Sequence, residues 1–255
     1  MAATNRGVNL DPAHIALLVG GILVVAFLYS SVGHAGASGY IAVMTLCGLA
    51  PTFVRPTALV LNIFVACVGT VQFWRAGHFS WRFFWPFALL SVPFAFAGGY
   101  LNVGSAILRP LLGAVLVFSA VRLFFRQGDP PQTSEPPAVV ALAVGAAIGF
   151  LSGLTGTGGG IFLTPLLLFC HWTYTRRAAA TSVVFILVNS TSGLIGFVSS
   201  GRPIPPDAWW LAIVAVVAGS VGSYFGSRRF AVRTISLLLA TVLVIAAYKL
   251  ILATT

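Results

Sequence analysis

The hydrophobic pattern of the chain consists of long apolar runs that alternate with short polar connections. In the first half, the runs cover residues 13–32, 40–50, 56–74, 83–101 and 108–125. In the second half, they cover residues 138–154, 161–172, 178–199, 208–225 and 234–252. Several runs approach or reach the ~20 apolar residues that a helix needs to cross a bilayer. The pattern therefore predicts an all-α, polytopic helical membrane protein, because an outer-membrane barrel would show short strands of alternating polarity instead.

Each half opens with a long run and a shorter return run, joined by a glycine-rich segment. We call these segments the first tip (residues 30–39) and the second tip (residues 155–160, Thr-Gly-Thr-Gly-Gly-Gly). A glycine costs a helix about 1 kcal/mol relative to alanine and leaves the backbone uncovered. At membrane depth, uncovered backbone is tolerated only where protein buries it or a cavity hydrates it. We therefore expect two broken-helix hairpins, residues 13–50 and 138–172, with tips that are candidate binding sites; close packing on small residues is the alternative.

The two halves match each other in an ordered series of residues, which indicates an internal duplication. The matched pairs include Phe27/Phe150, Gly33/Gly156, Gly36/Gly159, Cys47/Cys170, Thr57/Thr181, Asn62/Asn189, Gly69/Gly196, Gly77/Gly201, Trp85/Trp209 and Tyr100/Tyr224. Such repeats are common in secondary transporters. They predict a first repeat at residues 1–126, a proline-containing linker at 127–137 and a second repeat at 138–255. Each repeat would hold one hairpin and three transmembrane helices, 56–74, 83–101 and 108–125 in the first, and 178–199, 208–225 and 234–252 in the second.

Composition narrows the class of protein further. Of the 255 residues, 58% are hydrophobic and 7% are charged, which excludes a soluble domain with a polar surface. The formal net charge is +10, but the basic residues are scattered through the connections, so we expect no nucleic-acid partner. The acidic residues all fall outside the apolar runs, so no carboxylate is expected in the membrane interior; they are Asp11, Asp129, Glu135 and Asp207.

The remaining composition predicts neither a metal site nor a cofactor. The three cysteines, Cys47, Cys67 and Cys170, lie in apolar runs and are interpreted as buried small residues. The N-terminus carries Arg6 alone, and no small-residue cleavage site follows the first apolar run, so we expect no cleavable signal peptide. The protein is therefore expected to be a multi-pass protein of the cell (inner) membrane.

The arginines in the connections predict the orientation of the two halves. The basic connections contain Arg75/Arg82, Arg122/Arg126, Arg176/Arg177 and Arg228/Arg229/Arg233. Placing all four in the cytoplasm leaves Arg55, Arg109 and Arg202 outside. Counted along each half, the basic connections are the second and the last one in the first half. In the second half, they are the first and the third one. The halves are therefore expected to be two inverted repeats with opposed tips, although Arg6 and Lys249 do not fit this scheme.

The second tip and the residues after it resemble the sulfite exporter TauE/SafE family, also called the toluenesulfonate uptake permease group. The stretch from Gly153 to Pro165 is similar to the glycine signature and proline of that family. The segment Ala179-Ala180-Thr181-Ser182, followed by Asn189-Ser190, is similar to the family's segment after the return run. The resemblance covers essentially the whole chain, but Gly36-Ala37-Ser38-Gly39 replaces a full glycine triplet in the first half. It implies transport of small anions, especially sulfite, sulfonates or sulfoacetate.

A glycine tip between two helical legs suits an oxyanion for physical reasons. It exposes backbone N–H groups and the N-terminus of the return leg, whose dipole favours negative charge. Neighbouring hydroxyl groups add donors without adding charge, so the site can bind an anion without trapping it. The candidate substrate-binding residues at the tips are His34, Gly36, Ser38, Gly39, Thr155, Thr157, Gly158, Gly159 and Gly160.

Further candidates lie downstream of each tip. Asn62 and Asn189 occupy matching runs, and an amide in an apolar helix needs a partner, either the substrate or another helix. Thr57, Thr181 and Ser182 are weaker candidates, because hydroxyl groups can bond to the backbone of their own helix.

His34 is the only ionisable side chain at either tip. It is interpreted either as a proton relay or switchable anion contact, or as a structural histidine. Without an intramembrane carboxylate, anion transport could be coupled to an ion only through His34 or through protonation of the substrate. Otherwise transport would be uncoupled. An inside-negative potential would then suffice to drive an anion outward. Arg55, Arg176 and Arg177, at the membrane ends, are interpreted as topological anchors in preference to attractors of anions.

These features predict a secondary transporter that moves a small sulfur-containing anion outward by alternating access around paired tips. The alternatives are an anion channel or uniporter with the same lining, and an uptake permease for an organic anion. A membrane-embedded enzyme is disfavoured, because no carboxylate accompanies His34 to orient it. The expected partners are the small anion and the lipid bilayer; the sequence allows a homo-oligomer without specifying one.

Overall fold

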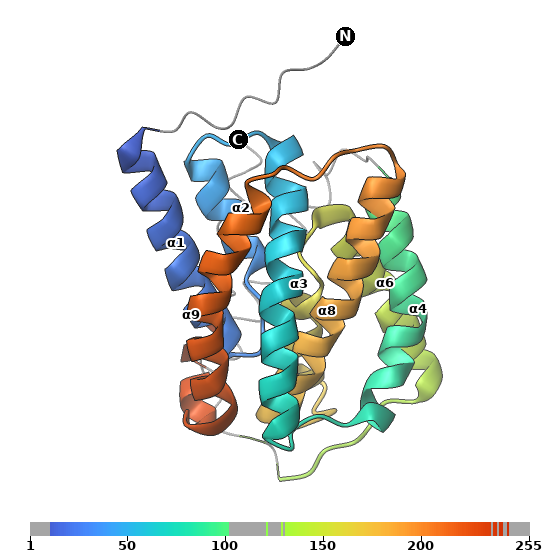
Figure 1. Cartoon of the computed structure of the whole chain (residues 1–255). Helices are drawn as coiled ribbons and strands as arrows, with labels where there is room; N and C mark the ends of the chain where they lie inside the picture. Colours follow the sequence, from blue (N-terminus) through green and yellow to red (C-terminus); the bar gives the residue numbers. More distant parts are fainter. Residues whose placement is uncertain are drawn as a thin grey trace.

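The computed structural model describes residues 11–101, 121, 129, 131–235, 237–238, 240–241 and 244, and within them the chain forms helices and connections without a strand. The helices are α1 Pro12–Ser31, α2 Ala37–Leu46, α3 Pro51–Arg75, α4 Trp81–Tyr100, α6 Ala138–Thr155, α7 Gly160–Phe169, α8 Thr175–Ser199 and α9 Ala208–Arg228 (Figure 1). The predicted helices 108–125 and 234–252 fall largely outside the described residues.

Six of the described helices are long and apolar enough to cross a membrane, namely α1, α3, α4, α6, α8 and α9. The two short helices, α2 and α7, are apolar as well but contain only 10 residues each. At a rise of about 1.5 Å per residue, such a helix reaches only about halfway across the hydrocarbon core. The prediction of a polytopic, all-helical membrane protein is confirmed.

The long helices α3 and α8 begin earlier than the hydrophobic pattern predicts. Helix α3 starts at Pro51 and passes through Pro56, and α8 starts at Thr175 instead of residue 178. Both helices are 25 residues long. The hydrophobic pattern assigned Arg55, Arg176 and Arg177, which lie near these helix starts, to the preceding connections. A long arginine side chain can, however, extend from a helical backbone towards a polar environment, so its charge need not end the helix.

Glycines in the left-handed conformation make the sharp reversals that separate the short helices from their partners. Gly36, with φ of 108°, precedes α2, and Gly159, with φ of 82°, precedes α7. L-residues with a side chain rarely adopt such angles, whereas glycine does so freely. In Figure 1, α1 and α2 enter and leave at the upper end of the molecule. Helix α2 therefore returns towards the end from which α1 came.

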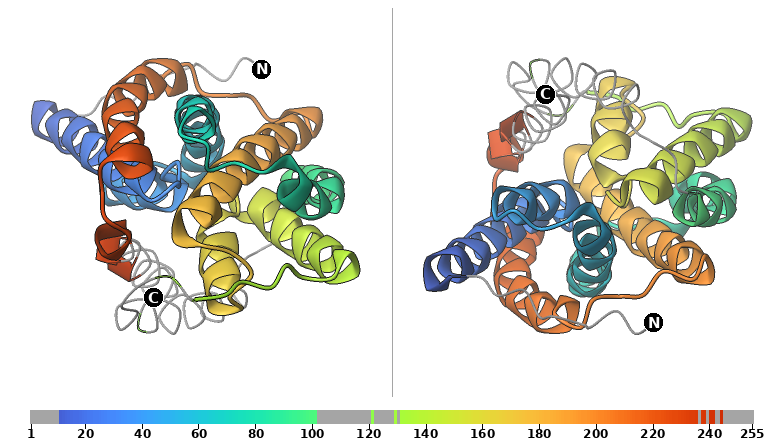
Figure 2. Two further views of the ribbon diagram at one scale, coloured as in Figure 1. Left: turned by 90° about the horizontal axis from the view of Figure 1, so that it is seen from below. Right: turned by 90° about the horizontal axis from the view of Figure 1, so that it is seen from above.

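The two halves of the chain interlock through contacts between backbones. Helix α6 packs on α4, and α1 packs on α9, while α3 and α8 contact each other between these groups (Figure 2). A Cβ atom added to Gly98 of α4 would collide with the carbonyl oxygen of Phe150, and one added to Gly222 of α9 would collide with that of Phe27. Glycines permit this approach because they carry no side chain. The first leg of each hairpin thus packs on a helix from the other half.

Gly98→Ala is expected to destabilise the protein by about 1–3 kcal/mol, because an added methyl group meets backbone that cannot move aside like a flexible side chain. Besides the Phe150 carbonyl, the new Cβ would lie 2.8 Å from the backbone nitrogen of Leu154. Gly20→Ala on α1 is the matched control, since nothing lies within 4 Å of its Cβ position. Thermal unfolding of both variants in detergent tests this; equal melting temperatures would contradict tight α4–α6 packing.

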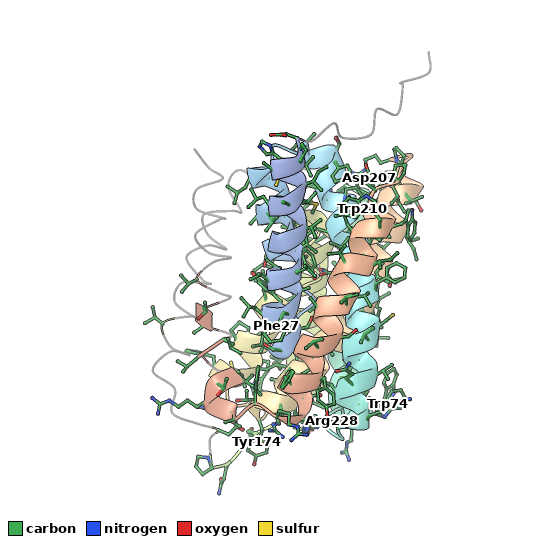
Figure 3. All side chains as sticks on the ribbon, turned by 60° about the vertical axis from the view of Figure 1, so that its left-hand side comes forward. Phe27, Trp74, Tyr174, Asp207, Trp210 and Arg228 are labelled. Atoms are coloured by element: carbon green, nitrogen blue, oxygen red, sulfur yellow. The ribbon has the colours of Figure 1, made fainter. Side chains whose placement is uncertain are left out.

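Charged groups of both halves gather at one end of the helices. There, Arg176 donates to the carbonyl of Phe230 (3.0 Å), His78 bonds the carbonyl of Ser227 (3.0 Å), and Arg177 pairs with Glu135 (2.9 Å). Figure 3 shows Trp74, Tyr174 and Arg228 near this end, and Asp207 and Trp210 near the opposite one. Exposed tryptophan and tyrosine side chains at both ends are typical of membrane–water interfaces.

Candidate functional site

The first tip contacts α7 and α8 through a chain of hydrogen bonds in the interior. The Nε2 atom of His34, in the first tip, lies 2.8 Å from the hydroxyl oxygen of Thr164 on α7. That hydroxyl donates to the hydroxyl of Ser182 on α8 at 2.6 Å. Because the single Thr164 hydrogen points to Ser182, its oxygen accepts from His34, which places a proton on Nε2. Nδ1 of the buried imidazole is then an acceptor, and no described residue bonds it.

A second polar cluster surrounds Gly158 of the second tip. The amide nitrogen of Asn62, on α3, donates to the hydroxyl of Ser190, on α8, at 3.2 Å. A Cβ atom on Gly158 would lie 2.7 Å from the Asn62 nitrogen and 2.8 Å from the Ser190 oxygen. Glycine is required here both for this close approach and for its φ of 76°. The Gly158 backbone therefore lies directly against polar groups from both halves of the chain.

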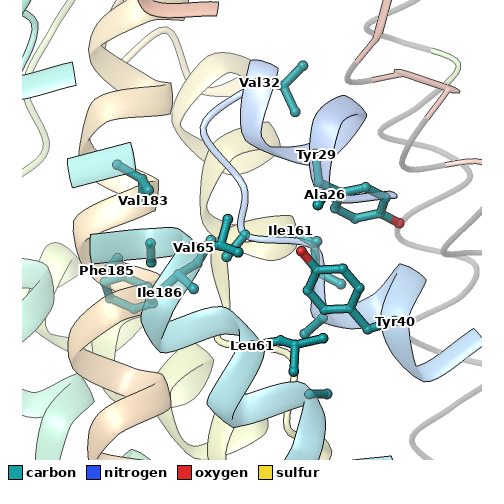
Figure 4. Packing of buried hydrophobic residues seen from close by; sticks show 14 of the residues in the cluster. Ala26, Tyr29, Val32, Tyr40, Leu61, Val65, Ile161, Val183, Phe185 and Ile186 are labelled. Atoms are coloured by element: carbon teal, nitrogen blue, oxygen red, sulfur yellow. The ribbon is translucent and has the colours of Figure 1, made fainter. Parts of the chain in front are cut away.

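The other two glycines of the second tip pack tightly in apolar surroundings. A Cβ atom on Gly159 would lie 2.9 Å from the ring of Phe185 and 3.0 Å from Ile148. One on Gly160 would lie 2.7 Å from Ile186 and 3.2 Å from Cδ2 of His34. Figure 4 shows Phe185 and Ile186 within the buried apolar cluster, with Tyr40 and Ile161 also near the tips. The sequence left two interpretations of this segment open, close packing and the lining of a binding site. The contacts of Gly159 and Gly160 show close packing, and those of Gly158 show polar neighbours.

The remaining tip residues make bonds within their own hairpins. Ser38 donates to the hydroxyl of Tyr29 (3.0 Å), and a Cβ atom on Gly36 would lie 2.9 Å from the hydroxyl of Tyr40. Gly39 faces Val25 and Tyr29 on α1. In the second tip, Thr155 donates to the carbonyl of Leu151 (2.7 Å) and lies 2.9 Å from the hydroxyl of Thr157. These contacts hold each tip to its preceding helix.

Several buried polar atoms on α3 and α8 have no hydrogen-bond partner among the described residues. They are both amide atoms of Asn189, the amide oxygen of Asn62, and the hydroxyls of Thr57 and Thr181, in residues that are 0% exposed. Leaving such an atom unpaired costs about 1–3 kcal/mol. Thr57 and Thr181 do not bond their own helices, as Thr191 does through the carbonyl of Leu187. Paired polar atoms would be expected if these residues served structure alone.

The equivalence of the two asparagines is only approximate. Thr57 and Thr181 occupy the same place in α3 and α8, six residues after each helix start (57 − 51 and 181 − 175). Asn62 lies eleven residues after its start (62 − 51), and Asn189 fourteen (189 − 175). Almost one helical turn therefore separates their positions along the two helices.

Sequence reasoning missed two residues of the site, Thr164 and Ser190. Thr164 lies four residues after Gly160, so both are on one face of α7. Ser182, Ile186 and Ser190 follow one another at the same spacing on α8, and all three contact the second tip or its return helix. The i, i+8 spacing of the hydroxyl groups of Ser182 and Ser190 on α8 was the available signal, but it does not specify which element that face contacts.

The interpretation of Arg55 as a topological anchor needs correction. Its guanidinium donates to the carbonyl oxygens of Gly98 (3.0 Å) and Gly153 (2.6 Å), and its Cγ lies 3.0 Å from a Cβ position on Gly156. Arg55 thus packs against the second tip. Arg176 and Arg177, by contrast, bond groups at the charged end of the molecule, as the anchoring interpretation expects.

Arg202, in the α8–α9 connection, lies beside Arg55. Its guanidinium donates to the carbonyl of Gly99 at 2.6 Å and stacks on the ring of Phe197. Burial lowers the pKa of the Arg202 guanidinium, which still keeps its proton at neutral pH.

The chemistry of the described site is neutral and polar. It offers amide, hydroxyl and imidazole groups together with the N-terminus of α7, where the N–H groups of Phe162 and Leu163 already donate to the carbonyl of Gly159. No three His, Cys, Asp or Glu side chains in the described residues are grouped to hold a metal ion. Such an arrangement can bind a small polar anion through hydrogen bonds and a helix N-terminus.

Comparisons with known proteins point to membrane transporters. The family model described as Sulfite exporter TauE/SafE matches residues 17–250. The probable membrane transporter protein y4hK of Sinorhizobium fredii is 41% identical over 248 residues, covering 95% of this chain and 100% of that protein. The probable membrane transporter protein YunE of Bacillus subtilis is 30% identical over 135 residues, which cover 51% of this chain and 48% of YunE. The probable membrane transporter protein YjnA of the same organism is 24% identical over 254 residues, which cover 93% of this chain and 99% of YjnA. No solved structure gives a significant match.

Proposed function

Because this chain belongs to the sulfite exporter TauE/SafE family, and is therefore a multi-pass membrane transporter and not an enzyme, we propose that it exports a small sulfur-containing anion. Sulfite, a sulfonate or sulfoacetate would suit the hydrogen-bond donors of the candidate site. The anion would bind between the two glycine tips, next to Asn62 and Asn189, and alternating access around the tips would move it. An inside-negative membrane potential favours this outward direction.

The unpartnered buried polar atoms are the observation that carries this proposal. The amide nitrogen of Asn189 and the hydroxyls of Thr57 and Thr181 are donors that no described residue uses. An oxyanion would accept these hydrogen bonds and remove the cost of leaving them unmade in a membrane interior. The free acceptors at Asn62 and His34 suit an anion that also carries an O–H group, as hydrogensulfite does. Neutral donors bind such an anion without holding it irreversibly.

Matching contacts in the two halves support the proposal of inverted repeats, residues 1–126 and 138–255. Helices α3 and α8 have equal length, and so do α2 and α7. Gly33 packs against Ala179, and Gly156 packs against Arg55, at corresponding places in α8 and α3. The concentration of arginines at one end of the helices supports assigning that end to the cytoplasm.

The burial of both tips supports a carrier in preference to an open channel. His34 is 1% exposed and Thr157 is 8% exposed, so these two tip side chains are shielded from solvent in this conformation. An open pore would leave a continuous hydrated path along its lining. A carrier passes through such an occluded state between its two open ones.

Reconstitution of the full-length protein in proteoliposomes tests the substrate class. We expect saturable flux of labelled sulfite or a simple sulfonate, with thiosulfate as a third probe and a monovalent cation as the negative control. Competition by each unlabelled anion would rank the substrates. Absence of flux for every anion, in protein shown to be folded and inserted, would contradict the proposal.

A further inference from the structure

We infer that Arg55 and Arg202 form a second oxyanion site, at the opposite end of the helices from the cluster of basic connections. The role of this site in transport rests on the proposed function, whereas its ability to bind an oxyanion does not. The ligand chemistry is a small, compact oxyanion such as sulfate, sulfite or a sulfonate. The phosphate of a lipid headgroup shares this chemistry.

The two guanidinium groups converge on the same partners. Both donate to the carbonyl oxygen of Gly99, Arg55 at 3.3 Å and Arg202 at 2.6 Å. Both also lie over the ring of Phe197, with guanidinium carbons 5.7 Å and 4.0 Å from its centroid. Two flexible, positively charged side chains from different helical regions are thus held together, although like charges repel.

No carboxylate of the described residues neutralises this pair. All four acidic residues lie in the described part of the chain, and none of them is within ion-pair distance of Arg55 or Arg202 there. The carbonyl acceptors at the C-terminus of α4 carry only about half an elementary charge as a helix dipole. The buried Nε atom of Arg55 has no hydrogen-bond partner among the described residues. An oxyanion bound to both guanidinium groups would use this donor and remove the repulsion.

The arginine pair is continuous with the second tip along one face of α3. Arg55, Leu59 and Asn62 follow at i, i+4 and i+7, so they share this face. Arg55 and Leu59 contact the Cβ position of Gly156, and Asn62 contacts that of Gly158. About two helical turns, or ~10 Å, separate Arg55 from Asn62. The second site is therefore placed to pass an anion to or from the tip.

Capping of α4 alone does not require the pair. Arg55 already bonds the carbonyls of Gly98 and Gly99, and Arg202 adds only the carbonyl of Tyr100 (3.2 Å) together with a like charge. The corresponding place in the other half also argues against a general packing role. There, Gly33 packs against Ala179, which carries no charge. The cationic site thus occurs beside the second tip and not beside the first.

Titration of the full-length protein with selenate in lipid-free detergent micelles tests this inference. Selenate has the shape and charge of sulfate, and calorimetry measures its affinity directly. In a Gly158→Ala background, which removes binding at the tip, Arg202→Gln is expected to weaken selenate binding by about ten-fold or more through loss of a charge-assisted contact. Arg55→Lys should weaken it as well. Arg177→Gln is the matched control, because it removes the same charge at the other end of the molecule.

The outcomes separate the two proposals. If wild-type protein shows no flux but selenate binding depends on Arg202, the transport proposal fails and the oxyanion site stands. If Arg202→Gln and Arg55→Lys both bind selenate like the Arg177→Gln control, the site is wrong, whatever the flux. Repeating the titration in nanodiscs with phosphatidylglycerol identifies the occupant. A lipid phosphate would lower the selenate affinity of wild-type protein and not that of Arg202→Gln, whereas a dissolved anion would bind equally in both media.

Discussion

Gly158→Ala is expected to reduce anion flux by about 100-fold, the effect that a displacement of ~1 Å has on a preorganised site. The new methyl group would lie 2.7 Å from the amide nitrogen of Asn62 and 2.8 Å from the hydroxyl of Ser190. It would therefore separate the two side chains that join the second tip to α3 and α8. The backbone at this position, with φ of 76°, also disfavours any residue with a Cβ atom.

Gly77→Ala is the matched control for this substitution. Gly77 has nearly the same backbone conformation, with φ of 77°, but nothing lies within 4 Å of its Cβ position. Both variants therefore carry the same backbone cost of about 1–2 kcal/mol. Flux per reconstituted molecule is the measurement, after size-exclusion chromatography has shown that both variants are folded. Equal flux in the two variants would mean that the Gly158 cluster does not line the path.

The bridge between His34 and Thr164 is expected to couple the two hairpins during transport. His34→Ala and Thr164→Val should each lower flux about ten-fold, which corresponds to ~1.4 kcal/mol in the limiting barrier. The double variant should be no slower than the slower single variant, because both changes remove the same hydrogen bond. This bond, at 2.8 Å, joins residues from different halves of the chain.

A double-mutant cycle on flux rates measures this coupling. Thr45→Val is the control for loss of a threonine hydroxyl, since Thr45 is exposed and donates to the carbonyl of Ile41 in its own helix. It should leave the rate unchanged. Multiplicative effects in the double variant would show that His34 and Thr164 act independently, and the bridge would then have no role in coupling the hairpins.

The sequence predicted the membrane-spanning helices of the described residues, because these depend on local chemistry. Length and apolarity determine which segments can cross a bilayer. The glycines of the second tip end α6, and Gly159 adopts a left-handed conformation before α7. The sequence also predicted that a polar group in an apolar run requires a partner, and His34 and Asn62 each have one.

The partners of these residues could not be predicted in the same way. The pairing of Asn62 with Ser190, and of His34 with Thr164, depends on the rotation of packed helices, which hydrophobic pattern does not determine. Arg55 was misinterpreted for a similar reason. Its sequence position suggests a membrane end, but the C-terminal carbonyls of α4 and the second tip draw its guanidinium inward.

The two tips differ in chemistry although their helices correspond. The first tip contributes His34, with an unused acceptor in the described structure, and the second contributes a glycine backbone beside Asn62 and Ser190. Arg55 lies against the second tip only. In the proposed mechanism, the second tip therefore provides most of the anion's donors. The first tip provides His34, the one imidazole at either tip.

Counterflow of labelled sulfite in proteoliposomes tests the central claim, carrier-mediated transport around the glycine tips, most directly. Vesicles loaded with unlabelled sulfite and diluted into a trace of labelled sulfite should accumulate label transiently above equilibrium when they contain wild-type or Gly77→Ala protein. Vesicles with Gly158→Ala protein should not. Label that equilibrates without an overshoot in wild-type vesicles, or an undiminished overshoot with Gly158→Ala, would contradict the account.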